Sequence, residues 1–222
     1  MPFDVGPARD CAACVRLAEF RTANRAAFPD WWNGPVPSFG RADARLMIVG
    51  LAPGLRGANR TGRPFTGDYA GDLLYDTLVR FGFASGVYDR RPDDGLTLID
   101  CAIVNAVRCV PPQNKPTPLE ISACRTYLTQ SMRALGGLKV VLALGRVAHE
   151  TVLRAVDARL AEFPFAHGAR HGLHSRGFVL FDSYHCSRYN TNTGTLTEAM
   201  FHDVFAAIRT ELTPSERVTS ER

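Results

Sequence analysis

The sequence lacks an apolar run long enough to cross a membrane, and its first residues do not follow the basic and then apolar order of a signal peptide. These two absences exclude an integral membrane protein and predict an intracellular, cytoplasmic one. Internal repeats and low-complexity tracts are also missing, which excludes a repeat architecture. The 222 residues suffice for one well-buried domain and are few for two.

A strong excess of charge of one sign is missing too. Hydrophobic residues make up 45% of the chain and charged residues 22%, which is the balance of an ordinary globular protein. The formal net charge of +4 is a mild bias towards anionic partners such as nucleic acid. Many enzymes with small substrates are equally basic, so the charge alone leaves the partner open.

Four nearly continuous apolar runs predict strands that are buried on both faces, as parallel strands are. They span residues 45–49, 96–104, 140–144 and 178–181. Apolar residues at helical spacing predict helices over 8–28, 69–82, 117–135, 146–158 and 195–212. This alternation predicts an α/β fold, a three-layer α/β/α sandwich with a short, mainly parallel four-stranded sheet.

The remaining segments complete the predicted organisation. Residues 29–40 are rich in proline and glycine and are expected to form a loop. One domain is expected to span 1–212, including the cysteine-containing N-terminal segment. Residues 213–222 are polar and charged and are expected to form a flexible tail.

Ligands of parallel α/β sheets bind beyond the carboxyl ends of the strands, so the segments that follow the strands are the candidate site. After the first strand comes GLAPGLRGANRTGRPFTGD, residues 50–68, with five glycines and two prolines. It is either a phosphate cradle or a surface loop whose glycines serve turns. The Gly-Lys-Ser/Thr of a P-loop is missing, as is a GxGxxG that opens a helix.

Two side chains of this first loop have a structural and a functional interpretation. Phe65 either packs in the core or offers a face on which a ligand stacks, and Asp68 either caps the next helix or takes part in chemistry. The arginines of the loop are either solvated or in contact with phosphates. They are Arg56, Arg60 and Arg63.

Two polar residues stand at the ends of other strands. Asn105 ends the second strand, where its amide either caps the strand or reads a pyrimidine through a donor and an acceptor. His185 follows the fourth strand, where it is either structural or a hydrogen-bond donor to a leaving group.

Six cysteines are present, and a disulfide framework is not expected in a cytosolic chain of this size. Cys11 and Cys14 form a CxxC motif, whereas Cys109 and Cys124 are separated by fourteen residues. Zinc sites usually use two closely spaced pairs, so metal binding, reactivity and simple burial all remain open. Cys101 lies within a predicted strand and is expected in the core.

Three segments together resemble the motifs of the family 5 uracil-DNA glycosylases. They are the stretch 50–68, the NAVRC with two following prolines that begins at Asn105, and HCSRYNTNTG from His185. The resemblance implies an enzyme that flips uracil, and deaminated or damaged bases such as hypoxanthine, out of duplex DNA and hydrolyses the N-glycosidic bond to leave an abasic site. Cys186 departs from the proline found at its position in many relatives.

The resemblance also implies roles for individual residues. The wider superfamily has a water-handling acid or amide early in the first motif, but this chain has only apolar residues and glycine there. That role therefore falls to another residue, either Asp68, the candidate consistent with family 5, or Asn105. The expected catalytic residues are Asp68, Asn105 and His185. The expected substrate-binding residues are Leu51, Ala52, Gly54, Phe65 and Asn105, and the expected DNA-binding residues are Arg60, Arg63, Ser187, Arg188 and Tyr189.

A structural [4Fe–4S] cluster held by Cys11, Cys14, Cys109 and Cys124 belongs to the same resemblance. The expected partner is double-stranded DNA with damaged bases, with single-stranded DNA as a second substrate. A monomer associated with a prokaryotic nucleoid is expected. The alternatives are a nucleotide-binding hydrolase and a non-catalytic iron–sulfur protein that binds DNA or senses redox state.

Overall fold

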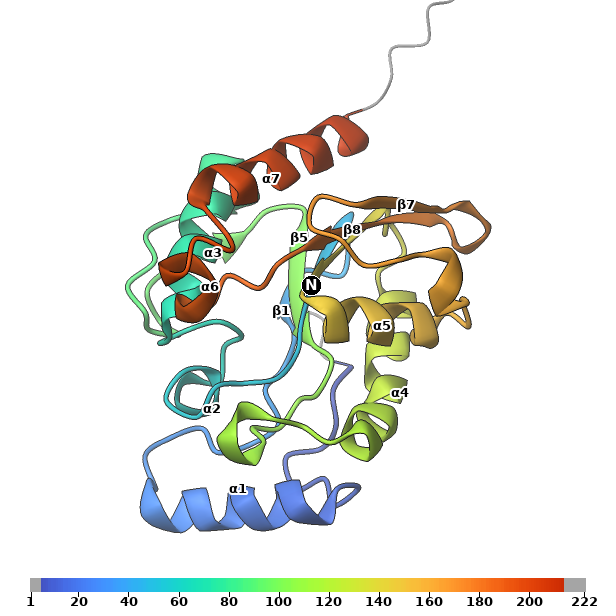
Figure 1. The fold of residues 1–222 in the computed structure, drawn as a ribbon. Coiled ribbons are helices and arrows are strands. Elements are labelled where there is room, and N and C mark those ends of the chain that lie inside the picture. Colours follow the sequence, from blue (N-terminus) through green and yellow to red (C-terminus); the bar gives the residue numbers. More distant parts are fainter. Residues whose placement is uncertain (1–4, 214–222) are drawn as a thin grey trace, which may run out of the picture.

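The computed structural model describes residues 5–213, and its centre is a six-stranded sheet with strand order β1-β5-β2-β6-β8-β7 (Figure 1). The four inner strands are parallel, and each edge strand is antiparallel to its neighbour. The strands are β1 (Phe39–Gly40), β2 (Leu46–Gly50), β5 (Cys101–Asn105), β6 (Val140–Leu144), β7 (Arg170–Leu173) and β8 (Phe178–Ser183). A separate ribbon pairs β3 (Ala84–Ser85) with β4 (Thr97–Leu98).

The prediction of four strands was therefore wrong at both edges of the sheet. Strand β1 is two residues long and lies within the segment 29–40 that was expected to be a loop. Strand β7 is polar and buries only its last residue fully. An edge strand can be short and half exposed, so it lacks the continuous apolar run that identifies an inner strand.

The predicted strand 96–104 is two strands, β4 and β5, that are separated by Ile99 and Asp100. Asp100 has a φ of 53°, in the left-handed region where an extended strand cannot continue. Its carboxylate accepts hydrogen bonds from the backbone N–H and the Nε of Arg45, at 2.9 and 2.8 Å. This link fixes the chain where β5 enters the sheet.

Seven α-helices surround the sheet in the described part of the chain. They are α1 (Val15–Ala27), α2 (Ala58–Thr61), α3 (Tyr69–Arg80), α4 (Pro118–Ala134), α5 (Arg146–Ala155), α6 (Arg188–Asn192) and α7 (Glu198–Leu212). Helix α1 begins at Val15 rather than at residue 8, so Cys11 and Cys14 precede it. None of the helices in residues 5–213 has both the length and the apolarity that a membrane span needs.

The predicted three-layer sandwich is confirmed, because alternate strand residues enter two different cores (Figure 1). On one face Ile48 packs in a cluster with Leu74 of α3 and Phe205 of α7. On the other face Met47 packs in a cluster with Leu128 of α4. Each fully buried side chain of this kind contributes about 1.5–3 kcal/mol to folding.

Parallel register brings the carboxyl ends of the inner strands to one edge of the sheet. Gly50 of β2 pairs with Asn105 of β5, and Leu144 of β6 pairs with Ser183 of β8. The segments that follow these strands therefore start side by side, although they are far apart in the sequence. The candidate site residues lie in these segments.

The fold leaves part of the predicted organisation untested. The expected single domain over 1–212 stays a prediction. The expected flexible tail lies, beyond Thr213, outside the described residues.

Candidate active site

A cavity of about 370 Å³ lies at this edge of the sheet. It brings together Phe65, Asp68, Asn105 and His185, which come from three different post-strand segments. Leu51, Ala52, Gly54, Ser187 and Arg188 also line it, as do Pro53, Ala58, Tyr69, Ala70 and Asn114. The spatial convergence that the sequence predicted is therefore present.

A larger hollow of about 1060 Å³ lies between β7, β8 and α7, but its two arginines and its glutamate are already paired. Arg170 and Glu211 form an ion pair of 2.8 Å there, and Arg45 binds Asp100. The smaller cavity instead holds a carboxylate oxygen without a partner, as described below. Chemistry rather than volume therefore identifies it as the candidate active site.

Gly50 allows the floor of the cavity to form. A Cβ at this position would lie 2.5 Å from Oδ1 of Asn105 and 2.6 Å from Cζ of Phe65. Because glycine has no Cβ, the amide and the aromatic ring approach the same point of the backbone. Any larger residue at position 50 would separate the two groups.

Phe65 is 6% exposed and has a φ of 53°, a strained conformation for an aromatic residue. Hydrogen bonds to the backbone hold it there: the hydroxyl of Tyr88 donates to the Phe65 carbonyl at 3.1 Å, and that of Tyr75 donates to the Pro64 carbonyl at 2.6 Å. The Phe65 ring stacks against the imidazole of His185, with centroids 5.8 Å apart. The strain thus places an aromatic face inside the cavity.

Asp68 stands immediately before α3 but makes no helix-capping hydrogen bond with its side chain. Its Oδ1 is buried and has no hydrogen-bond partner. Burial raises the pKa of this carboxyl, against the smaller opposite effect of the N–H groups of Gly71 and Ala70. Asp68 also lines the cavity, so its carboxylate is available there to a ligand or a water molecule.

The glycines of the first loop make room for Asp68. A Cβ at Gly57 would collide with the Asp68 carboxylate, and a Cβ at Gly54 would lie 3.2 Å from its Oδ2. The glycines that the sequence left between a phosphate cradle and a simple turn therefore have a third use. They let the backbone pass beneath a buried carboxylate.

His185 follows β8 and points its ring towards Phe65. The side-chain amide of Asn190 donates to the His185 carbonyl at 2.8 Å, which ties the residue to α6. Burial lowers the pKa of the imidazole to about 4. His185 is therefore neutral at pH 7 and retains one ring N–H to donate.

Asn114 is a cavity residue that the sequence did not single out. It ends a 3₁₀ turn over Pro112–Asn114, and both Gln113 and Asn114 are left-handed, with φ of 56° and 57°. Two consecutive left-handed residues are strained, and strain of this kind often serves a site. The sequence does carry a signal that could have identified Asn114. It is an asparagine, a residue that tolerates the left-handed conformation, and it stands among prolines in the segment after β5.

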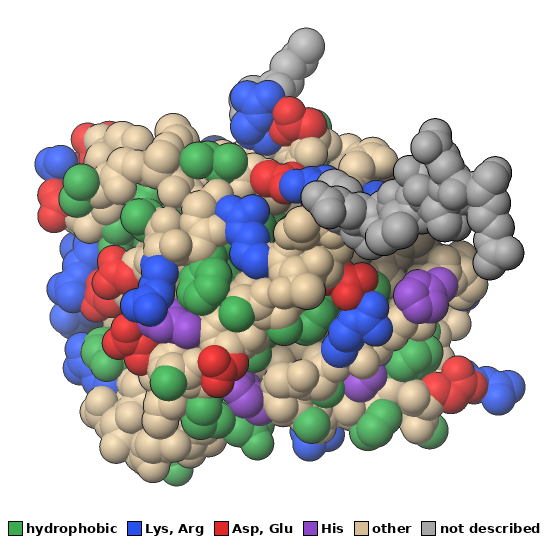
Figure 2. Space-filling view, turned by 90° about the horizontal axis from the view of Figure 1, so that it is seen from above, with side chains coloured by type: hydrophobic (Ala, Val, Ile, Leu, Met, Phe, Trp, Pro, Cys, Tyr) green, Lys and Arg blue, Asp and Glu red, His purple; other side chains and the backbone are tan. Residues whose placement is uncertain are grey.

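Arg60, Arg188 and Tyr189 are exposed, and Arg188 lines the cavity. The Arg188 guanidinium lies 5.1 Å from the centre of the Tyr69 ring. The Arg60 side chain lies close to Gly67, because a Cβ added to Gly67 would be 2.9 Å from Nη2 of Arg60. Ser187 caps α6 through its side chain, which accepts from the N–H of Asn190. Basic and acidic side chains are interspersed on the face shown in Figure 2. The DNA contacts of Arg60, Ser187, Arg188 and Tyr189 stay a prediction.

Arg63 does not reach the surface, and its assignment to DNA binding was wrong. The side chain is 6% exposed, and its two Nη atoms donate to the two carboxylate oxygens of Asp94 at 2.8 and 2.7 Å. Its Nε donates to Thr66, and the guanidinium packs against the rings of Tyr75 and Tyr88. Asp94 lies 31 residues away from Arg63, so the sequence around Arg63 does not show that the two residues pair.

Four cysteines line an enclosed apolar pocket. They are Cys11, Cys14, Cys109 and Cys124, and all four are free. The N–H of Arg108 donates to Sγ of Cys124 at 3.3 Å, and Nη1 of Arg21 donates to Sγ of Cys109 at 3.5 Å. Burial raises the pKa of both thiols, and these two donors oppose that effect in part. Cys101 is buried within β5, as expected.

An ion pair connects the elements that carry these cysteines. Arg16 of α1 donates to both oxygens of Glu120 in α4, at 2.8 and 2.7 Å. Glu120 also completes a capping box with Thr117 at the start of α4. The segment with Cys11 and Cys14 is thereby held against the helix that carries Cys124.

Comparison with known proteins agrees with this geometry. Residues 37–209 match the uracil DNA glycosylase superfamily. The chain is 44% identical to a type-5 uracil-DNA glycosylase of Thermus thermophilus, over 87% of this chain and 90% of the relative. It is 41% identical to that of Mycobacterium leprae, over 88% of each chain, and 38% identical to that of Pyrobaculum aerophilum, over 85% and 83%.

Replacing Asp94 with alanine should destabilise the protein strongly. Arg63 would become a buried charge without its partner, at a cost of about 3–5 kcal/mol in the free energy of unfolding. The guanidinium holds the pKa of Asp94 well below its usual range, so this stabilisation is present at neutral pH and is lost as the pH falls below about 4.

Urea denaturation at pH 7 measures this cost. The control is Asp89→Ala, which removes a carboxylate that is 68% exposed from the same loop. Equal stability of the two variants at pH 7 would contradict the assignment.

Proposed function

The chain belongs to the uracil DNA glycosylase superfamily, and on this premise we propose that it repairs DNA by excising uracil through hydrolysis of the N-glycosidic bond. One observation carries the proposal. Phe65, Asp68, Asn105 and His185 converge on a single cavity of about 370 Å³, within the usual size range of small-ligand pockets.

The reaction needs the base outside the DNA stack, because a base inside a duplex is out of reach. Extrusion costs a few kcal/mol, and less for a mispaired uracil than for a paired base. The Phe65 face recovers part of this cost by stacking on the extruded base. The Asn105 amide offers a donor and an acceptor to the edge of a pyrimidine.

Cleavage of the bond builds positive charge on the sugar and negative charge on the departing base. The Asp68 carboxylate stabilises the positive charge and orients the attacking water. Asn114 lines the same cavity and shares the water. The neutral imidazole of His185 donates a hydrogen bond to the base as it becomes an anion, with help from the backbone N–H groups of Leu51 and Ala52.

The substrate range extends to other deaminated bases such as hypoxanthine. The side chains of residues 51–54 are apolar or absent, so they select a base by shape, and only the backbone of this segment donates hydrogen bonds. Duplex DNA is the main partner and single-stranded DNA a second one. Arg60 and Arg188 contact phosphates, and Tyr189, which is 75% exposed, wedges the duplex.

The four-cysteine pocket is the proposed site of a [4Fe–4S] cluster. No three of the cysteine sulfurs in residues 5–213 all lie within 4.8 Å of one another. A single zinc ion, with Zn–S bonds of about 2.3 Å, would bring four sulfurs to roughly 3.8 Å. The wider spacing and four thiol ligands suit an iron–sulfur cluster, which supplies a covalent link between the N-terminal segment and the sheet.

Substitution of the two polar groups at the reacting bond should abolish most of the activity. Asp68→Asn and His185→Ala are each expected to lower the single-turnover rate of uracil excision about 10²–10³-fold, because each removes charge stabilisation in the transition state. Asp72→Asn, a carboxylate one turn further along α3, is the control and should retain the rate. An unchanged rate in either active-site variant would refute the assignment.

The pH dependence of excision should report the ionisation of Asp68. The carboxyl acts as an anion and its pKa is raised, so the rate should increase with pH through that pKa and level off above it. His185 adds no step near neutral pH, because its pKa is about 4. In Asp68→Asn the acidic decline attributed to Asp68 should be missing; persistence of the same decline would assign it elsewhere.

Iron analysis tests the cluster. The protein purified without oxygen should contain about four iron atoms per chain and absorb near 400 nm. Cys109→Ser should lose the iron and melt at a lower temperature. Cys101→Ala should retain the iron, because Cys101 lies in the core of β5 away from the four-cysteine pocket. Iron-free wild-type protein, or zinc in place of iron, would contradict the proposal.

A further inference from the structure

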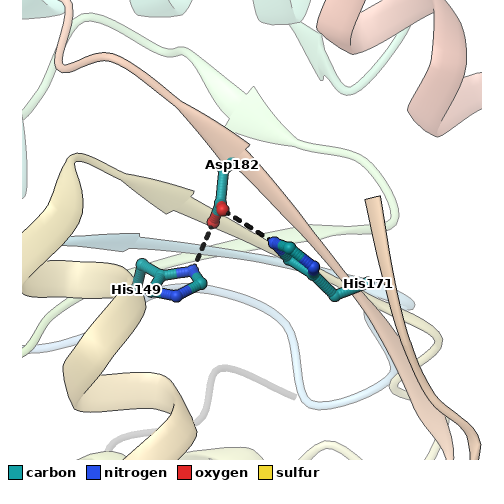
Figure 3. Close-up of side chains that lie close together, drawn as sticks. All are labelled: His149, His171 and Asp182. Carbon is teal, nitrogen blue, oxygen red and sulfur yellow. Dashed lines mark hydrogen bonds and ion pairs between the residues drawn. The ribbon is translucent and has the colours of Figure 1, made fainter. Parts of the chain in front are cut away.

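A second cluster of titratable groups lies outside the cavity, where Asp182 of β8 stands between two histidines (Figure 3). Oδ1 of Asp182 lies 2.8 Å from Nδ1 of His149 in α5, and Oδ2 lies 3.0 Å from Nε2 of His171 in β7. The side chains of Asp182 and His149 are 0% and 2% exposed. Three elements thus meet at one carboxylate inside the protein.

The partners of His149 determine where its protons lie. Its Nε2 is 2.9 Å from the carbonyl of Phe163, which only accepts, so this nitrogen carries a proton. Its Nδ1 faces the Asp182 carboxylate, which also accepts when ionised. A second proton must therefore lie between Nδ1 and Oδ1, because two lone pairs at 2.8 Å would repel. The contact is a charge-assisted hydrogen bond.

Residues 163–171 form a strap that holds the end of β8 from several sides. The N–H of Gly168 donates to the Asp182 carbonyl at 2.9 Å, and the N–H of Asp182 donates to the Ala169 carbonyl at 3.0 Å. Further along, the N–H of Tyr184 donates to Nδ1 of His167 at 3.2 Å, and these two rings stack. The restrained residues lead directly to His185.

We propose that the His149–Asp182 hydrogen bond positions His185 in the cavity, with Asp182 and His149 as positioning residues rather than catalytic ones. This inference rests on the proposed glycosylase function of His185. His185 follows Asp182 by three residues. A displacement of the Asp182 carboxylate therefore also displaces the His185 ring that stacks on Phe65. A displacement of about 1 Å at a reacting group costs up to 10²-fold in rate.

A divalent metal ion is the competing occupant of this cluster. The three ligand atoms lie within 4.8 Å of one another, which a metal would permit. Contacts of 2.8 and 3.0 Å are the usual lengths of hydrogen bonds, whereas two ligands of one tetrahedral zinc ion lie roughly 3.3 Å apart or more. The geometry therefore favours a proton.

Two substitutions at His149 separate its two hydrogen bonds. In His149→Asn the amide nitrogen takes the place of Nδ1 and keeps the bond to Asp182. In His149→Gln it takes the place of Nε2 and keeps the bond to Phe163 instead. The Gln variant should lose at least about tenfold in single-turnover excision with DNA affinity unchanged, and the Asn variant should stay within about threefold of the wild type.

Nuclear magnetic resonance supplies a readout that does not need activity. The ring signals of His185 should shift in the Gln variant and not in the Asn variant, and wild-type protein should show a protected proton on Nδ1 of His149. His174→Asn, at an exposed histidine three residues beyond His171, is the control and should change neither rate nor signals. Melting temperature and iron content verify that each variant is folded.

Several results would overturn the inference. Equal losses in both variants, unmoved His185 signals in the Gln variant, or the absence of the Nδ1 proton in wild-type protein would each do so. Stoichiometric zinc that is bound by the wild type and lost from both variants would assign the cluster to a metal. Wild-type protein that lacks excision activity would instead refute the proposed function, while the resonance measurements still decide the positioning role.

Discussion

The site depends on how closely β2 and β5 approach at their carboxyl ends. Gly50 pairs with Asn105 in parallel register, and the missing Cβ of Gly50 is the space in which the amide and the Phe65 ring meet. Parallel strands deliver their ends to the same edge, but only a glycine at this position leaves the end of the strand open. The cavity is therefore a consequence of register and of one absent side chain.

Polar groups next to the cavity hold the backbone of Phe65 in its strained conformation. The Arg63–Asp94 pair and the hydroxyls of Tyr75 and Tyr88 hold Phe65 in a left-handed conformation. Buried ion pairs contribute little net stability compared with apolar packing, yet they penalise any rearrangement that separates the charges. Such a support suits a residue that must keep one orientation before its ligand arrives.

Burial changes the two candidate catalytic groups in opposite directions. It raises the pKa of Asp68 and lowers that of His185, because in each case it disfavours the charged form. In the proposed mechanism Asp68 acts as an anion and His185 as a neutral donor. One apolar environment would then supply an under-solvated carboxylate for the sugar and an uncharged imidazole for the base. Burying these two polar groups costs free energy, and the packing of the two apolar cores on either side of the sheet offsets that cost.

The sequence alone determined the α/β class, the inner strands and the post-strand segments that supply Phe65, Asp68, Asn105 and His185, because buried strands and glycine-rich loops leave local patterns. Tertiary structure decided what depends on distant partners. It added the two edge strands, buried Arg63 against Asp94, brought Asn114 into the cavity and joined His149 to Asp182. A residue's own sequence neighbours do not show which group 31 or 33 positions away completes its hydrogen bonds, since only the folded chain brings the two together.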